Sequence, residues 1–132
     1  MKYLLDTNIC IYIIKKKPDS VIKRFLKMKP DSIGISSITV SEMYYGAAKS
    51  LKHDQNTIAL EQFILPLTVI DYNKEDSIVY GKLRAKLELK GKLIGAMDML
   101  ITAQALNRDL ILITNNEREF KKVEGLSIEN LV

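Results

Sequence analysis

Short apolar runs of strand length recur along the chain, and helical patterns separate them. The runs lie at residues 3–5, 33–36, 67–70 and 110–114, with a weaker one at 126–128. Between them, apolar residues repeat at spacings of three and four, as in helices that bury one face. Strands that alternate with helices predict a parallel sheet covered on both faces. We therefore expect an α/β fold, a three-layer α/β/α sandwich around a central, mainly parallel sheet of four to five strands.

Length and composition predict one globular domain over residues 1–132. The chain has 132 residues, of which 47% are hydrophobic and 27% charged. No apolar stretch approaches the roughly 20 residues that a membrane span needs. The first acid follows too soon for a secretory signal, so we expect the protein in the cytoplasm. Its single cysteine, Cys10, excludes an internal disulfide and a cysteine-based metal cluster.

The net charge of +4 favours a polyanionic partner. The basic residues gather in four groups: residues 15–17; Lys23, Arg24, Lys27 and Lys29; Lys82, Arg84, Lys86, Lys90 and Lys92; and Lys121 with Lys122. Any one group taken alone is better explained as a solvated helix face. Nucleic acid gains weight as a partner because a candidate acidic centre lies between these groups.

Three acidic residues far apart in the chain, Asp6, Glu42 and Asp98, lie in or directly after apolar segments. A carboxylate among large apolar neighbours is costly to bury unpaired, and no run of Lys or Arg accompanies these three. Asp98 stands out, because residues 96–106 are nearly all apolar and imply a helix buried almost all round. Asp6 and Asn116 each follow a strand, and ligands of open parallel sheets bind beyond the carboxyl ends of the strands. Glu42 and Asp98 fall in the opening turns of helices that begin at that edge, so all four side chains should meet there. A divalent cation bound between them would neutralise the carboxylates, and we expect one at this edge.

Simple structural explanations compete at three of these positions. Asp6 could cap a helix that starts after the first strand. Asn116 could belong to a turn, where Asn is common. Glu42 could close a capping box with Thr39, an explanation that fails if the helix begins at Ser37.

Four segments in order resemble the motif set of PIN-domain ribonucleases, in particular the VapC toxins of bacterial toxin–antitoxin pairs. The segments are LLDTN at 4–8, SITVSE at 37–42, IGAMD at 94–98 and TNNEREF at 114–120. Each motif alone is weak, but four in this order are a specific signal, and the match covers essentially the whole chain. The resemblance implies a PIN-like sandwich and a metal-dependent endoribonuclease that acts as a toxin.

The same resemblance assigns roles to individual residues. It implies that Asp6, Glu42, Asp98 and Asn116 are catalytic. Asp6 and Asp98 would bind Mg²⁺, with Mn²⁺ as a possible substitute, and Glu42 would hold a water molecule. The cleaved RNA would end in a 3′-hydroxyl and a 5′-phosphate. Three residues compete to complete the site: Asn116, Thr114 and Glu119.

Substrate and partners are also implied by the resemblance. VapC relatives typically cut a structured tRNA loop, and the anticodon arm of initiator tRNA is a substrate of some. The family further implies a homodimer, no membrane partner, and a cognate VapB-type antitoxin whose tail covers the crevice. Met43, Tyr44 and Tyr45 could supply an apolar groove for that tail or could equally belong to the core.

Two other functions compete with the nuclease. In the first, the chain is a phospho-acceptor regulatory module of doubly wound fold, with Asp6 accepting the phosphoryl group. Related phosphatases need a second Asp two residues later, where this chain has Asn8. In the second, the chain is a non-catalytic RNA-binding PIN-like protein; the presence of all three acids argues against it.

Overall fold

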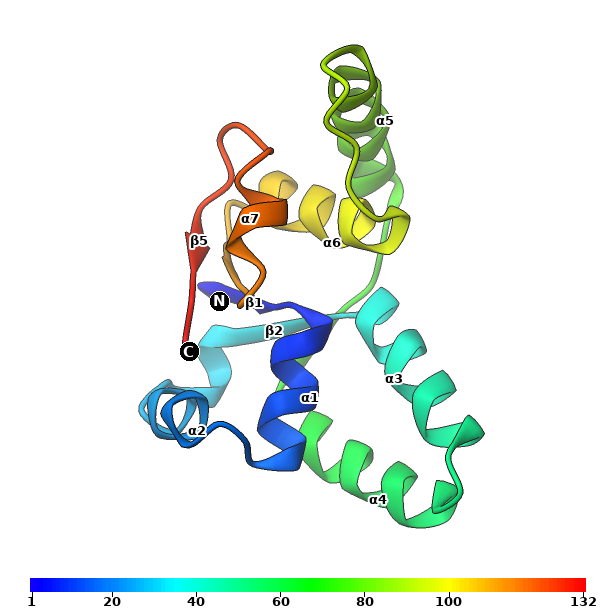
Figure 1. The fold of residues 1–132 in the computed structure, drawn as a ribbon, viewed down its shortest axis with the longest axis vertical. Coiled ribbons are helices and arrows are strands. Elements are labelled where there is room, and N and C mark those ends of the chain that lie inside the picture. The colour runs from blue at the N-terminus through cyan, green and yellow to red at the C-terminus, as the bar shows by residue number, and fades with distance from the viewer.

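The computed structural model describes residues 1–132 and contains a parallel sheet between two layers of helices (Figure 1). Its five strands are β1 (Tyr3–Leu5), β2 (Ile33–Ser36), β3 (Thr68–Ile70), β4 (Ile111–Ile113) and β5 (Ile128–Glu129). They lie in the order β3-β2-β1-β4-β5, and each adjacent pair is parallel. The sandwich expected from the alternation of strands and helices is therefore confirmed, with a sheet that is parallel throughout.

Seven α-helices connect or follow these strands. They are α1 (Thr7–Lys15), α2 (Asp19–Leu26), α3 (Ser37–Lys49), α4 (His53–Ile64), α5 (Lys74–Leu89), α6 (Ala96–Asn107) and α7 (Glu117–Phe120). A 3₁₀ turn, Pro30–Ser32, leads into β2. In Figure 1, α1, α2 and α4 lie on one side of the sheet and α5, α6 and α7 on the other.

Alternate residues of the central strands build the two cores. Leu4 and Leu112 point to one face and pack in a cluster with residues of α5, α6 and α7. The next residues along, Leu5 and Ile113, belong to the cluster formed with α1, α2, α3 and α4. All four are fully buried, as the two-residue period of a strand with covered faces requires. Each such side chain contributes roughly 1.5–3 kcal/mol by leaving water.

The helix expected at residues 96–106 is α6, and it is buried almost all round, as predicted. Residues 101–105 are all buried, and so is Met99. Since the body of α6 is held so firmly, its first turn has a fixed place at the carboxyl edge of the sheet. None of the helices combines the length and apolar character needed to cross a membrane.

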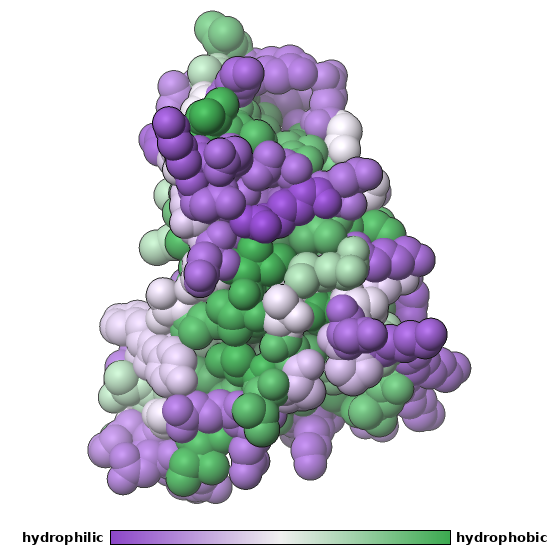
Figure 2. All heavy atoms as spheres, turned by 180° about the vertical axis from the view of Figure 1, so that it is seen from behind, coloured by the Kyte–Doolittle hydropathy of each residue, from purple (hydrophilic) through white to green (hydrophobic).

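Some large hydrophobic side chains stay at the surface. Figure 2 shows hydrophobic atoms gathered across the middle of the back of the molecule, beneath a band of hydrophilic ones. Leu51, Leu65 and Leu89 are among the most exposed. Contiguous apolar surface of this kind is typical of proteins that bind a partner.

Candidate active site at the carboxyl edge of the sheet

Asp6 occupies the step from β1 to α1. It is the N-cap residue of α1, as the structural explanation supposed, and its Oδ1 accepts from the backbone N–H of Thr7 at 2.7 Å. Its Oδ2 accepts from the hydroxyl of the fully buried Thr114 at 2.8 Å. Burial raises the pKa of Asp6, these two hydrogen bonds lower it, and the Glu42 carboxylate raises it, with a net rise. Asp6 can therefore cap α1 and belong to the candidate site at the same time.

Glu42 lies in the second turn of α3. The helix begins at Ser37, and the N-cap is Ser36, whose hydroxyl accepts from the N–H of Ile38 at 3.0 Å. The capping-box explanation for Glu42 therefore fails, as it must when the helix starts this early. Its Oε1 instead accepts a hydrogen bond from the hydroxyl of Thr7 at 2.9 Å. Glu42 is thus linked to the start of α1.

Asp98 is the third residue of α6, and the N-cap of that helix is Gly95. A Cβ at Gly95 would lie 3.1 Å from Asp98 Oδ2, so the glycine leaves room for this carboxylate. Burial, followed by the charges of Asp6, Glu42 and Glu119, raises the pKa of Asp98 to about 6. The three predicted acids therefore lie near enough to repel one another electrostatically, although they come from three separate elements.

No cation of the chain neutralises this group. The ion pairs of the structure use other carboxylates, and none includes Asp6, Glu42 or Asp98. As the side chains stand, no three His, Cys, Asp or Glu residues form a group that could hold a metal ion. The donor set fits a hard divalent cation all the same, because Mg²⁺ is usually bound through one or two protein carboxylates and several waters. Two unpaired carboxylates, Asp6 and Asp98, are suitable ligands.

The remaining predicted positions lie around the end of β4. Asn116 is exposed and is the N-cap residue of α7; its backbone N–H donates to Thr114 Oγ1 at 3.0 Å, and its side chain caps no helical N–H. Thr114 therefore contacts Asp6 directly, whereas Asn116 joins it through Thr114. Glu119 is half-buried and paired with Lys122 at 3.3 Å. Among the residues proposed to complete the site, Thr114 is the one with a direct hydrogen bond to an acid.

Two threonines complete the hydrogen bonding, and the sequence analysis assigned neither to the site. The Thr7 hydroxyl lies 3.1 Å from that of Thr39 as well as 2.9 Å from Glu42. Thr39 is fully buried in the first turn of α3. No periodicity links Thr7 to residues 32 and 35 positions later, so only the fold reveals the contact.

An apolar groove runs from the acids between α1, α3 and α4. It encloses about 360 Å³, and its lining includes Ile11, Ile14, Met43 and Leu60, with Thr7 and Glu42 at the site end. Met43 is also buried in the core, whereas Tyr44 and Tyr45 are exposed. Met43 is therefore a core residue that also lines a groove.

Comparison with known proteins agrees with this geometry. Residues 3–126 match the family model described as the PIN domain. The chain is 44% identical to "Ribonuclease VapC2" of Haemophilus influenzae, a match that covers 100% of this chain and 99% of the relative. It is 42% identical to "tRNA(fMet)-specific endonuclease VapC" of Salmonella typhimurium, covering 98% of both.

Solved structures with the same fold include toxin–antitoxin complexes. The crystal structure of DNA-bound VapBC from Salmonella typhimurium superposes with a TM-score of 0.95 at 42% identity and covers 100% of this chain and 99% of that one. The VapBC2 structure from Rickettsia felis, bound to a promoter DNA fragment, gives 0.91 at 43% identity with 98% of both chains covered. By sequence and by fold, this protein belongs to the PIN domain family and, within it, to the VapC ribonucleases.

Proposed function

We propose that this protein is the toxin of a type II toxin–antitoxin pair and a Mg²⁺-dependent endoribonuclease. The observation that carries the proposal is the group of Asp6, Glu42 and Asp98: Glu42 raises the pKa of Asp6, both raise the pKa of Asp98, and none of the three is paired with a cation of the chain. The regulatory-module alternative is not favoured, because Asn8 stands two residues after Asp6, where its phosphatase relatives require a second Asp. We treat residues 1–132 as one PIN domain acting in the cytoplasm.

In the proposed reaction the residues of the chain have separate tasks. A divalent cation held by Asp6 and Asp98 would supply charge stabilisation for the phosphodiester and its leaving oxygen. Glu42 would hold and orient the attacking water through its carboxylate. Thr114 keeps Asp6 in place through its hydroxyl, and Asn116 is exposed beside it, free to contact the RNA or a second water. The expected products carry a 3′-hydroxyl and a 5′-phosphate.

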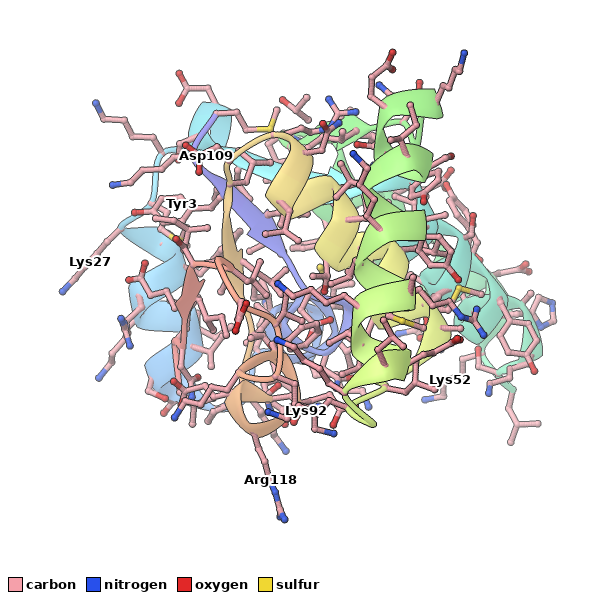
Figure 3. The ribbon with its side chains drawn as sticks, turned by 90° about the horizontal axis from the view of Figure 1, so that it is seen from above. Tyr3, Lys27, Lys52, Lys92, Asp109 and Arg118 are labelled. Atoms are coloured by element: carbon pink, nitrogen blue, oxygen red, sulfur yellow. The ribbon has the colours of Figure 1, made fainter.

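The proposed substrate is a structured tRNA loop, with the anticodon arm of initiator tRNA as the first candidate. Its support is the similarity to the Salmonella tRNA(fMet)-specific endonuclease and the net charge of +4. Lysines and arginines bind phosphates of any sequence, so charge supplies affinity and not base choice. In Figure 3, Lys27 and Arg118 extend away from the body on opposite layers, where a polyanion can reach them.

The proposed protein partners are a VapB-type antitoxin and a second copy of the chain. The groove between α1, α3 and α4 suits an apolar segment of the antitoxin, because Ile11, Ile14 and Met43 line it and it ends at Glu42. A basic side chain from that segment could then reach the unpaired acids and inhibit the enzyme by occupying the place of the cation.

The test is cleavage of a tRNA pool by purified protein with Mg²⁺, with Mn²⁺ and with a chelator. We expect cleavage with either metal, none with chelator, and losses of at least about 100-fold in Asp6→Asn and Asp98→Asn. Asp31→Asn removes an exposed acid far from the site and should cleave like the wild type. Equal cleavage by all variants would indicate a contaminating nuclease and overturn the proposal. RNA binding without cleavage by the wild type would favour the non-catalytic alternative.

A further inference from the structure

One residue, Thr7, connects two of the three acids. Thr7 is the first residue of α1: its backbone N–H donates to Asp6 Oδ1 at 2.7 Å, and its hydroxyl lies 2.9 Å from Glu42 Oε1. We propose that Thr7 is a positioning residue that fixes the Glu42 carboxylate relative to Asp6. The inference rests on the proposed nuclease function and assigns a part in it to a residue outside the acidic set.

The direction of these hydrogen bonds follows from counting protons. A threonine hydroxyl has one proton to donate, whereas an ionised carboxylate can only accept. The proton of Thr7 therefore points to Glu42, and Thr39 must donate its own to Thr7 Oγ1 across the 3.1 Å contact. The result is an ordered chain from Thr39 through Thr7 to Glu42. Because Thr39 is fully buried, the inner end of this chain is rigid.

Glu42 needs such a restraint more than Asp6 does. Asp6 has a short side chain, and its two oxygens are held separately by Thr7 and Thr114. Glu42 has one more rotatable bond, is half-buried, and accepts its one side-chain hydrogen bond from Thr7. Without that bond its carboxylate could move away from Asp6, which repels it. A group that must orient water in a reaction loses efficiency when its position is not fixed.

The experiment compares Thr7→Val, which keeps the shape and removes the hydroxyl, with Thr7→Ser, which keeps the hydroxyl. Outer partners of metal-site ligands typically contribute about 10–100-fold to metal affinity or activity. We expect Thr7→Val to lower single-turnover tRNA cleavage about 10–100-fold and to weaken Mn²⁺ binding, measured by calorimetry, by about 10-fold. Thr7→Ser should stay within about 3-fold of the wild type in both. Thr68→Val makes the same chemical change on an exposed strand residue and should alter neither.

A double-mutant cycle with Glu42→Gln separates positioning from general damage. If Thr7 acts through Glu42, Thr7→Val should change Mn²⁺ affinity by less than about 2-fold once Glu42 is already replaced. A melting temperature within a few degrees of the wild type checks that the fold is kept. Should Thr7→Val fail to fold, Thr39→Val removes the bond to Thr7 from its other end and should lower cleavage about 3-fold, again only when Glu42 is present.

The possible results distinguish a failure of the Thr7 proposal from a failure of the proposed nuclease function. Active wild type with an unaffected Thr7→Val would overturn this proposal and leave the nuclease function standing. Equal losses in Thr7→Val and Thr7→Ser, or full additivity with Glu42→Gln, would also overturn it, because the hydroxyl would then not be the cause. A wild type that neither cleaves tRNA nor binds Mn²⁺ would overturn the proposed function and this proposal together.

Discussion

Among the individual side chains, Asp98 is ionised at an electrostatic cost to the folded state. Its folded-state pKa of about 6 lies above the ordinary value of 3.8, so its ionisation destabilises the metal-free protein. We expect Asp98→Asn to stabilise that form at pH 7.5 by on the order of 1–2 kcal/mol, after allowance for its partial exposure. The gain should be full above about pH 6, shrink as the pH falls, and vanish below about pH 4, where both states are protonated.

Thermal unfolding in a chelator between pH 4 and 8 measures this effect. Asp98→Asn should melt roughly 3–8 °C above the wild type at pH 7.5, and Asp31→Asn should not. Added Mg²⁺ should raise the melting temperature of the wild type but hardly that of Asp98→Asn, because the ligand is lost. A variant less stable than the wild type at pH 7.5 would contradict the idea that Asp98 is held at a cost.

The residues that could be predicted from the sequence are those whose chemistry conflicts with their neighbours. Asp98 could be identified because a carboxylate interrupts an apolar helix, and Asp6 because it ends an apolar strand. Thr7 could not, because a threonine at a helix start suits any protein and its contact with Glu42 spans 35 positions. The sequence does not decide which of Thr114, Asn116 and Glu119 completes the site, because the answer depends on side-chain directions.

Between the secondary-structure elements, Asp76 joins the start of α5 to the end of α6. It is fully buried, closes a capping box with Asn73, and accepts from Asn107 at 2.9 Å and from Arg108 at 3.1 Å. Burial alone would raise the pKa of Asp76, but the hydrogen bonds from Asn73, Asn107 and Arg108 lower it below its ordinary value. The carboxylate therefore stabilises this junction as an ion.

We expect Asp76→Ala to lower the free energy of unfolding by about 3 kcal/mol at pH 7, since it removes the hydrogen bonds from Asn107 and from the partly exposed Arg108 and opens the capping box. Glu75→Ala, on the exposed side of the same turn, should cost less than about 1 kcal/mol. Because the folded-state pKa of Asp76 is depressed, the loss of stability in Asp76→Ala should be complete above about pH 4 and fade as the pH falls further. Urea denaturation of both variants at pH 7 and pH 3 tests this prediction. It would be contradicted if Asp76→Ala and Glu75→Ala lowered the free energy of unfolding equally at pH 7.

Strands could largely be predicted from short apolar runs, and helices from apolar spacings of three and four, but the junctions between them could not. The junction at Asp76 joins residues 31 and 32 positions apart. Sequence patterns show which face of a single helix or strand is apolar. They do not report which helix ends meet, because that depends on how the helices are laid across the sheet.

For the chain as a whole, the alternation of strands and helices predicts the layers. Only the structure shows which basic side chains are free of ion pairs. The basic groups look alike in sequence, yet three of the five residues in the group on and after α5 are paired: Arg84 pairs with Glu88, and Lys86 and Lys90 share Glu124. These two lysines lower the pKa of Glu124 to about 2. On the α2 side, Lys23 and Lys27 form no ion pair.

This difference predicts where RNA phosphates bind. We expect Lys23→Gln with Lys27→Gln to weaken RNA binding and to reduce the slope of log affinity against log salt by about 1, since each lost phosphate contact removes about 0.7 for single strands. Lys86→Gln with Lys90→Gln should leave the slope almost unchanged, because those ammonium groups already face a carboxylate.

Fluorescence anisotropy of a labelled tRNA anticodon arm, from 50 to 200 mM salt and in the Asp98→Asn background, measures both slopes without cleavage. The two double variants change the net charge equally, so unequal slopes report the position of the RNA and not the overall charge. If Lys86→Gln with Lys90→Gln reduces the slope more than Lys23→Gln with Lys27→Gln does, the RNA lies over α5. Binding there would first have to break the ion pairs of Lys86 and Lys90 with Glu124.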